Sequence, residues 1–274
     1  MKKRLLNLFD AASLFIIYLF SGLLGQVLVL LSDIVLTAFE FQSSQMQIQN
    51  DIFMERVFEL FAGQTVQTLL VSNLVVVVLY WLAFCRRKET LRHYAGLYAP
   101  KMGTMLCAFV SGLLLHFLVI VCINLIELPQ TLMEQYDSGM EQMFEGSLAL
   151  VLLTSLVVAP LVEEIVFRGA LLKALQKSLN LPIAVLSSSA LFALVHINPV
   201  QMGYAFVLGL ILCILRLKSG SLWGCVAMHI AFNAANYLPA EKIVTSPLTL
   251  ALGVVAFFCF YLLSCIKSKK HYCI

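Results

Sequence analysis

Charged residues are scarce in this sequence: Asp, Glu, Lys and Arg make up 12% of its 274 residues, whereas 61% are hydrophobic. A soluble domain usually carries about 25% charged and about 45–50% apolar residues. The apolar residues here come in runs long enough to cross a bilayer, which takes roughly 17–25 residues. The composition excludes an ordinary soluble protein and predicts one domain embedded in a membrane.

Cysteine pairs and basic patches are missing as well. None of the 8 cysteines forms a C-x-x-C pair, so the sequence predicts neither a disulfide framework nor a cysteine-based zinc site. The net charge is only +3, and no stretch combines dense Lys and Arg with interleaved aromatic residues. That combination is typical of nucleic-acid surfaces, so no nucleic-acid partner is expected.

The apolar runs predict an all-α fold, a polytopic transmembrane helical bundle of about eight spans. The first run follows Lys2, Lys3 and Arg4 and lacks a small-x-small cleavage pattern, which favours a retained helix over a signal peptide. Spans five and six are separated only by Asn198 and Pro199, which predicts a tight hairpin buried inside the protein. The expected spans cover residues 11–36, 65–84, 103–126, 147–167, 182–197, 200–215, 221–238 and 246–266.

The distribution of Lys and Arg predicts the orientation of the bundle. If the N-terminus is cytoplasmic, the segments expected inside hold every basic residue except Arg56, Arg168 and Lys242. Cytoplasmic loops of membrane proteins carry such an excess of basic residues. The two long loops expected outside are acidic or neutral. We therefore expect both termini on the cytoplasmic side, in keeping with an even number of spans.

The fourth span contains two adjacent carboxylates, Glu163 and Glu164, followed by Arg168. A charged side chain at the middle of a span costs about 2.5–3.5 kcal/mol, so each of them is a functional hypothesis. Glu164 and Arg168 are four residues apart and share a helix face, which predicts an ion pair. Glu163 is turned about 100° away and is left to handle a proton. Pro160, one turn earlier, removes a backbone hydrogen bond and is expected to kink the helix.

Two further spans carry polar side chains. His196 follows Phe192 by four residues in the fifth span, and His229 and Asn233 share one face of the seventh. Taken singly, the glutamates are also explained as a helix end, and the other residues as ordinary helix-packing contacts. Taken together, these groups all need partners in a low-dielectric interior, so we expect them to surround one water-sized space. Paired acids and imidazoles in such a space can activate a water molecule.

The patterns E-E-x-x-x-R, F-x-x-x-H and H-x-x-x-N, in this order on successive helices, resemble the CAAX-protease and bacteriocin-processing family of membrane peptidases. This family includes the type II CAAX prenyl endopeptidases, and its bacterial branch is known as abortive-infection or bacteriocin self-immunity proteins. The resemblance covers residues 145–240, expected to be a catalytic helical core. Residues 1–140 carry no readable motif, and residues 246–274 are expected to form a last span and a basic cytoplasmic tail. The residues that fill the patterns are Glu163, Glu164, Arg168, Phe192, His196, His229 and Asn233.

The resemblance implies an intramembrane endopeptidase with Glu163, Glu164, His196, His229 and Asn233 as catalytic residues, and with Arg168 and Phe192 as structural residues at the site. In one scheme, Glu163 and His196 activate water while His229 and Asn233 donate hydrogen bonds to the developing oxyanion. In the other, His196, His229 and Glu163 bind Zn²⁺ and the remaining glutamate is the base. Because the sequence has no contiguous H-E-x-x-H and Asn is a poor zinc ligand, we favour the scheme without a metal.

The expected substrate is a membrane-associated peptide, or a prenylated or bacteriocin-like protein. The expected location is a bacterial cell membrane, with the active site opening to the cytoplasmic side. Two other functions remain open: a proton-coupled transporter, because intramembrane Glu and His residues also relay protons, and a catalytically idle membrane scaffold. No inverted repeat of the kind found in many transporters is evident, and the intact motifs argue against a scaffold.

Overall fold

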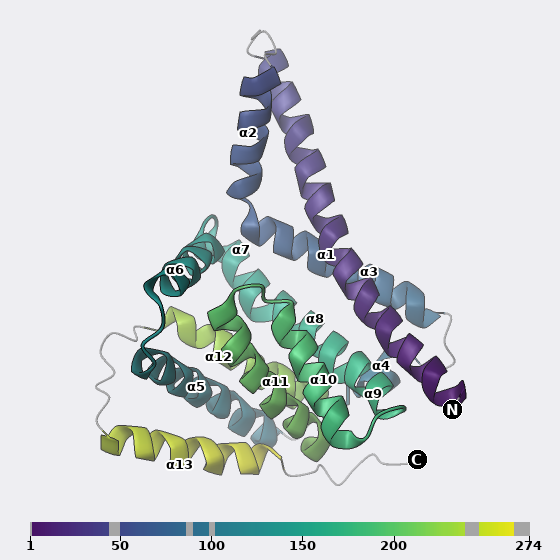
Figure 1. Ribbon diagram of the computed structural model, residues 1–274, viewed down its shortest axis with the longest axis vertical. Helices are drawn as coiled ribbons and strands as arrows, with labels where there is room; N and C mark the ends of the chain where they lie inside the picture. Colours follow the sequence, from purple (N-terminus) through teal and green to yellow (C-terminus); the bar gives the residue numbers. More distant parts are fainter. Residues whose placement is uncertain (1, 44–49, 86–89, 99–101, 239–246, 266–274) are drawn as a thin grey trace.

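The computed structural model describes residues 2–43, 50–85, 90–98, 102–238 and 247–265, and every regular element within these ranges is a helix (Figure 1). The predicted all-α class is therefore confirmed. Lys267, Lys269 and Lys270 of the expected basic tail lie outside the described residues, as does Lys242.

Five helical stretches are long and apolar enough to cross a membrane. Four of them coincide with expected spans: α3 (Thr65–Cys85), α5 (Met102–Leu125), a composite helix over Leu148–Gln176, and α11 (Pro199–Ser219). The fifth, α1 (Lys2–Ser43), extends well beyond the expected 11–36 at both ends.

The other three expected spans correspond to shorter helices. These are α10 (Leu181–Leu194), α12 (Leu222–Ala234), which continues into the single turn η3 (Ala235–Tyr237), and α13 (Pro247–Ser264). A helix of 14 residues such as α10 is about 21 Å long, which is less than the roughly 30 Å of a bilayer core. Length therefore supports five crossings, and the count of eight and the orientation stay predictions.

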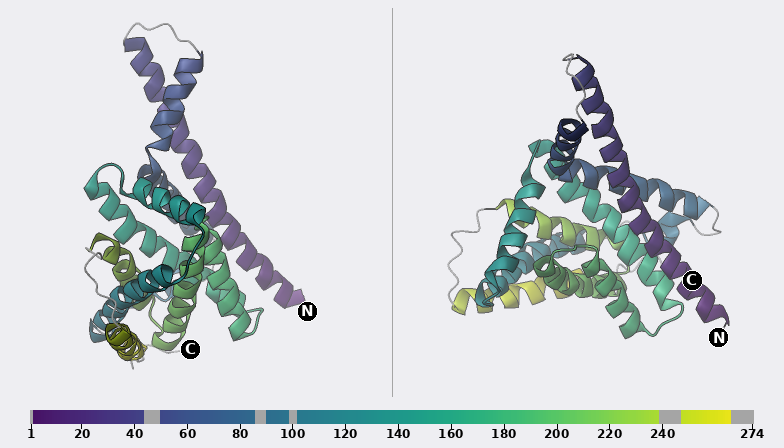
Figure 2. Two further views of the ribbon diagram at one scale, coloured as in Figure 1. Left: turned by 60° about the vertical axis from the view of Figure 1, so that its left-hand side comes forward. Right: turned by 45° about the horizontal axis from the view of Figure 1, so that its top comes forward.

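α1 forms a projecting hairpin with α2 (Asn50–Ala62), which stands away from the other helices in all three views (Figures 1 and 2). α1 has 42 residues and is about 63 Å long, roughly twice the thickness of a bilayer core. Arg56 on α2 lies 3.6 Å from Glu40 on α1 and 2.9 Å from Glu59. At the base of the hairpin, Gln64 donates a 2.8 Å hydrogen bond to the buried Asp33.

The fourth expected span is a composite helix that alternates between α and π turns. It consists of α7 (Leu148–Leu152), η1 (Leu153–Val158), α8 (Ala159–Glu164), η2 (Ile165–Leu171) and α9 (Leu172–Gln176). Pro160, expected to kink the helix, is the second residue after the first π segment. The disruption thus takes the form of a wider turn, and π turns inside α-helices often occur at functional sites.

α10 and α11 form the predicted tight hairpin, but the prediction that it is buried inside the protein is wrong at the turn, where Ile197 is 85% exposed. The Asn198 side chain caps α11 by accepting hydrogen bonds from the backbone N–H groups of Val200 and Gln201. Packing between the two helices is close, because a Cβ on Gly209 would lie 3.0 Å from the Cβ of Ser189. This hairpin holds His196 at the turn between the two helices.

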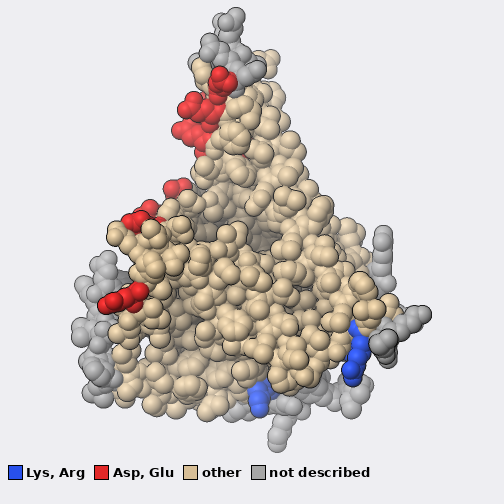
Figure 3. All heavy atoms as spheres, in the orientation of Figure 1, with Lys and Arg blue, Asp and Glu red and all other residues tan. Residues whose placement is uncertain are grey.

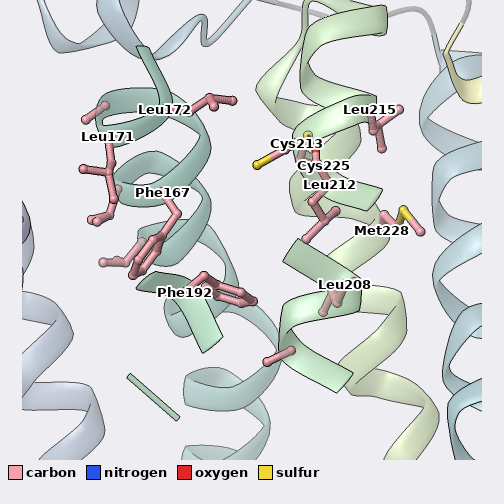
Figure 4. Packing of buried hydrophobic residues seen from close by; sticks show 14 of the residues in the cluster. Phe167, Leu171, Leu172, Phe192, Leu208, Leu212, Cys213, Leu215, Cys225 and Met228 are labelled. Carbon is pink, nitrogen blue, oxygen red and sulfur yellow. Dashed lines mark hydrogen bonds between the residues drawn. The ribbon is translucent and has the colours of Figure 1, made fainter. Parts of the chain in front are cut away.

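Aromatic and aliphatic side chains from α1, η2, α10, α11 and α12 form the main hydrophobic core. Figure 4 shows Phe167 of η2 beside Phe192 of α10, and the ring centroids are 5.2 Å apart in an edge-to-face arrangement. Leu212, Cys213 and Cys225 meet where α11 packs against α12. This core fixes the composite helix against α10, so it also fixes the motifs that these helices carry.

Charged side chains separate along the molecule. On the face seen in Figure 3, acidic side chains gather at one end, over α2 and α6 (Gln130–Phe144), while Lys and Arg appear at the opposite end. The basic residues Lys173, Lys177 and Arg216 belong to segments expected on the cytoplasmic side. The short helix α4 (Leu91–Ala95) belongs to another of these segments. This separation is the pattern from which the sequence predicted the orientation.

Candidate active site

A cavity of about 1150 Å³ brings together four of the predicted site residues: Glu163, His196, His229 and Asn233. The prediction of a water-sized space is wrong, because one water occupies only about 30 Å³ of liquid. The cavity is instead as large as the sites that hold drug-sized ligands. Its remaining walls come mainly from α1, α3, α5, α6 and α11, and Figure 3 shows a hollow in the surface between α6 and α1.

Glu164 and Arg168 lie behind the cavity wall rather than in it. Nη1 of Arg168 donates a 2.7 Å hydrogen bond to Oε1 of Glu164, and both side chains are fully buried. The predicted ion pair is therefore confirmed. A buried carboxylate without a countercharge would cost several kcal/mol, so the pair is what allows Glu164 to sit at this depth.

His229 connects the two glutamates. Its Nδ1 lies 2.9 Å from Oε1 of Glu164, and its Nε2 lies 3.8 Å from Oε2 of Glu163. An ionised carboxylate only accepts hydrogen bonds, so Nδ1 of His229 is protonated and its N–H donates a hydrogen bond to Glu164. Glu164 thereby fixes the ring and turns Nε2 toward Glu163 and the cavity. This contact makes Glu164 a positioning residue rather than a group that touches substrate.

His196 is oriented by its own helix. Its Nδ1 lies 2.7 Å from the backbone oxygen of Phe192, and a carbonyl only accepts, so Nδ1 is the protonated nitrogen. Nε2 of neutral His196 is then a hydrogen-bond acceptor. The next residue, Ile197, has a φ of 58°, a left-handed conformation that is rare for a β-branched side chain. Such local strain is found mainly at functional sites.

The Phe192 ring is the common neighbour of the buried groups. Its centroid lies 4.8 Å from that of His196, 5.8 Å from that of His229, and 4.0 Å from Cζ of Arg168. A guanidinium over an aromatic face is attracted by the ring quadrupole. Phe192 is fully buried, and its position supports the structural role expected for it.

Asn233 is held by the π turn of the composite helix. In a π turn the carbonyl of Ser155 would accept from the residue five positions later, but that residue is Pro160, which has no N–H. Nδ2 of Asn233 donates to this carbonyl instead, at 3.0 Å. An amide group carries two N–H donors, so the second remains for a group in the cavity. The proline thus creates the acceptor that positions Asn233.

The residues expected to bind zinc do not form a metal site as arranged here. Among the described residues, no group of three or more His, Cys, Asp or Glu side chains is placed to hold a metal ion. Glu163, His196 and His229 share the cavity without meeting at one point in ligand geometry. No step below therefore passes through a metal, and the zinc scheme and the glutamate scheme both stay predictions.

Sequence reasoning missed two buried polar residues that line the cavity, Asn73 of α3 and His116 of α5. Each is only 4% exposed. The rule that singled out His196, a polar residue inside an apolar span, applies equally to His116. Both were overlooked because they lie outside the three motifs.

Residues 145–235 match the family model described as type II CAAX prenyl endopeptidase Rce1-like. This stretch is similar to that family, and we call it the Rce1-like domain. It runs from just before α7 into η3 and contains every residue of the three patterns. Comparisons with curated proteins and with solved structures gave no match. The Rce1-like domain supports a CAAX-type membrane protease at the level of the family, and it leaves α1–α6 and α13 outside.

Proposed function

We propose that the chain is an intramembrane endopeptidase that hydrolyses a peptide bond inside the cavity of its Rce1-like domain. The observation that carries this proposal is the connected series Arg168–Glu164–His229–Glu163. The series ends at a cavity that also contains His196 and Asn233. It gives a buried site one carboxylate oriented for proton transfer and one held in place by a countercharge.

Charge balance sets the resting state of this series. Two carboxylates and one guanidinium would leave a net negative charge in a buried cluster, which is costly. One further proton on Nε2 of His229, facing Glu163, makes the cluster neutral. Because the proton lies between two groups that interact strongly, it belongs to the pair rather than to either residue.

In this state Glu163 is ionised and acts as the base. It takes one proton from a water molecule. Nε2 of His196 accepts a hydrogen bond from the other O–H of that water and so aligns the water for attack. The hydroxide attacks the scissile carbonyl carbon. The oxyanion that develops accepts hydrogen bonds from Nε2–H of His229 and from the second amide N–H of Asn233.

Glu163 then gives its proton to the leaving nitrogen as the C–N bond breaks. One new carboxyl group and one new amine result, and the cluster returns to its starting charge. Each proton that leaves the water is thus accounted for without a further reactant.

The size of the cavity and its apolar surroundings favour a membrane-associated peptide or protein segment as the substrate. The Rce1-like domain supports the same general class. A prenylated or a bacteriocin-like substrate, and a bacterial cell membrane as the location, stay predictions.

Two topology predictions conflict with each other: a cytoplasmic N-terminus, and an active site that opens to the cytoplasmic side. α6 forms part of the cavity wall, and α6 lies in a loop that the charge pattern places outside. With a cytoplasmic N-terminus, the cavity therefore approaches the outer surface, and we retain this orientation because it rests on the charge separation. Labelling with a membrane-impermeant thiol reagent decides it, using Ser138→Cys on α6 and Lys177→Cys after α9 in a cysteine-free background. The orientation predicts that only position 138 is labelled from outside.

Turnover of a peptide reporter tests the proposed function. Glu163→Gln and His196→Ala should each lower product formation, followed by mass spectrometry, by about 10²–10⁴-fold, the usual contribution of general acid–base groups. Glu145→Gln, at an exposed carboxylate between α6 and α7, is the matched control and should leave turnover unchanged. Normal turnover by folded Glu163→Gln would rule out this mechanism. A transporter would lose flux in that variant without forming any product.

A further inference from the structure

The Rce1-like domain supplies only part of the cavity wall. Another part of the wall is built by α1, α3 and α5, which lie outside the family match. Most lining residues there are apolar or small. Asn73 and His116 are the two lining residues on this wall with buried polar side chains in the described part of the chain.

His116 has an unused nitrogen. Its Nδ1 is buried and has no hydrogen-bond partner among the described residues. The ring forms a hydrogen bond with the backbone of Phe232 and packs edge-to-face on the Phe232 ring, with centroids 5.2 Å apart. A helical backbone N–H is already bonded within its helix, so the Phe232 carbonyl accepts the Nε2–H. Nδ1 of neutral His116 is therefore a hydrogen-bond acceptor.

Close packing of α5 on α12 sets the position of His116. A Cβ on Gly112 would collide with the backbone oxygen of Met228, so only glycine permits this approach. One helical turn further along both helices, His116 lies beside Phe232, which directly precedes Asn233. The imidazole is thus held next to the turn of α12 that carries the proposed oxyanion donor.

Asn73 also presents an acceptor. Its Nδ2 donates a 2.8 Å hydrogen bond to the backbone oxygen of Leu69, one turn earlier on α3. The amide oxygen of Asn73 has no partner among the described residues. A buried acceptor that stays unpaired costs about 1–3 kcal/mol, so the unpaired Nδ1 of His116 is explained by a bound molecule that supplies an N–H group. The Asn73 oxygen offers a second acceptor on the same wall.

We propose that His116 and Asn73 form a substrate subsite that accepts hydrogen bonds from backbone N–H groups of the peptide, in the same cavity as Glu163. This inference rests on the proposed peptidase function, which makes a peptide the occupant of the cavity. An extended peptide backbone carries an N–H donor at every residue except proline and needs acceptors wherever it is buried. The helices outside the family match would then bind the substrate while the Rce1-like domain performs the chemistry.

The test measures binding separately from turnover. The probe is a fluorescein-labelled ten-residue peptide, selected from a random library for binding to Glu163→Gln in detergent micelles. A second set of probes replaces one backbone amide at a time with an ester, which removes a single N–H. Fluorescence anisotropy gives the dissociation constant of each probe for Glu163→Gln alone, and for Glu163→Gln combined with His116→Phe, His116→Asn or Asn73→Leu.

We expect the effects of the ester and of the His116 variant on the binding free energy to be non-additive. At one position, the ester should weaken binding to Glu163→Gln by about threefold to tenfold, the usual range for a neutral hydrogen bond. His116→Phe should weaken binding of the amide probe by a similar factor. In this variant the ester should cause no further loss of binding. His116→Asn places an oxygen near the Nδ1 position and should restore most of the loss. Asn73→Leu should act in the same way at a different position of the peptide.

Ser111→Ala is the matched control, because Ser111 is buried on the same helix, bonds to the carbonyl of Cys107 and does not line the cavity. It should bind every probe as Glu163→Gln does. Equal binding by His116→Phe and by Ser111→Ala would overturn the subsite, as would a library that yields no binding peptide. Failure of the peptidase proposal appears elsewhere, as equal turnover by the wild type and by Glu163→Gln.

Discussion

Buried polar side chains behave differently in the Rce1-like domain and in the helices that precede it. In the domain several of them bond across helices: His229 to Glu164, Asn233 to the carbonyl of Ser155, and Ser188 to the carbonyl of Phe167. In α1, α3 and α5 several bond instead to the preceding turn of their own helix. Examples are Ser21 to Ile17, Asn73 to Leu69 and Ser111 to Cys107.

A buried polar group in a membrane protein can obtain its hydrogen bond in two ways, from its own helix or from another helix. A bond to the preceding turn depends only on local sequence and leaves the helix free to pack anywhere. A bond across helices fixes their relative position and holds side chains in one geometry, which catalysis requires. His116 is an exception in the N-terminal helices, since its ring bonds to α12 and one of its nitrogens has no partner.

Arg168→Met should have the largest effect on stability, because it strands the buried Glu164 carboxylate. Removing one partner of a buried pair costs about 3–5 kcal/mol, whereas replacing both is often close to neutral. We therefore expect the double variant Glu164→Gln/Arg168→Met to recover much of the loss. Unfolding in detergent measures both variants. A double variant as unstable as Arg168→Met would show that the charge pair is not the cause.

Asn233→Ala should lower kcat by about 10²–10³-fold, the effect of removing one oxyanion donor. Asn233→Asp keeps the shape but loses both N–H donors, so it should be equally impaired. Steady-state kinetics with the peptide reporter measures both. If Asn233→Asp retained normal turnover, Asn233 would not stabilise the transition state through its amide.

Gly112→Ala tests whether α5 supports the catalytic helix. The added Cβ would collide with the backbone oxygen of Met228, and overpacking of this kind costs about 1–3 kcal/mol. Gly103→Ala on the same helix is the control, because a Cβ there meets nothing within 4 Å. The unfolding midpoint should fall for Gly112→Ala alone. Equal midpoints would mean that α5 and α12 pack less closely than the structure shows.

Arg56→Met should have the smallest effect. Its ion pairs with Glu40 and Glu59 are exposed, and exposed pairs contribute about 0–1 kcal/mol. We expect turnover and unfolding midpoint close to those of the wild type. A large loss of activity would give the projecting α1–α2 hairpin a role in catalysis that its distance from the motifs does not suggest.

The sequence predicted the helical class, the α10–α11 hairpin and the Glu164–Arg168 pair, because each follows from local rules of spacing and hydrophobicity. The length of α1 could not be predicted in this way. Its second half packs on α2, so the helix continues past the thickness of a membrane through tertiary contacts. The π turns were also missed, since Pro160 indicates a disturbed helix without specifying its form.

The motifs identified the residues that share the cavity but not the arrangement of its groups. That His229 bridges Glu163 and Glu164 depends on how α12 packs on the composite helix, over a separation of 65 residues between His229 and Glu164. The size of the cavity depends on α1, α3, α5 and α6, whose sequences carry no motif. Local sequence patterns therefore predicted the catalytic residues, whereas the cavity that would hold the substrate could be seen only in the three-dimensional structure.

A kinetic cycle at Glu163 and His229 tests the central claim most directly. The account holds that these two residues share one proton and act as a unit in hydrolysis, Glu163 as the base and His229 as an oxyanion donor. Glu163→Gln, His229→Ala and the double variant are compared for turnover of the same peptide reporter, after each is shown to be folded. Groups that act as a unit give non-additive losses. The double variant should therefore be no slower than the slower single variant, whereas losses that multiply would show that the two residues act independently.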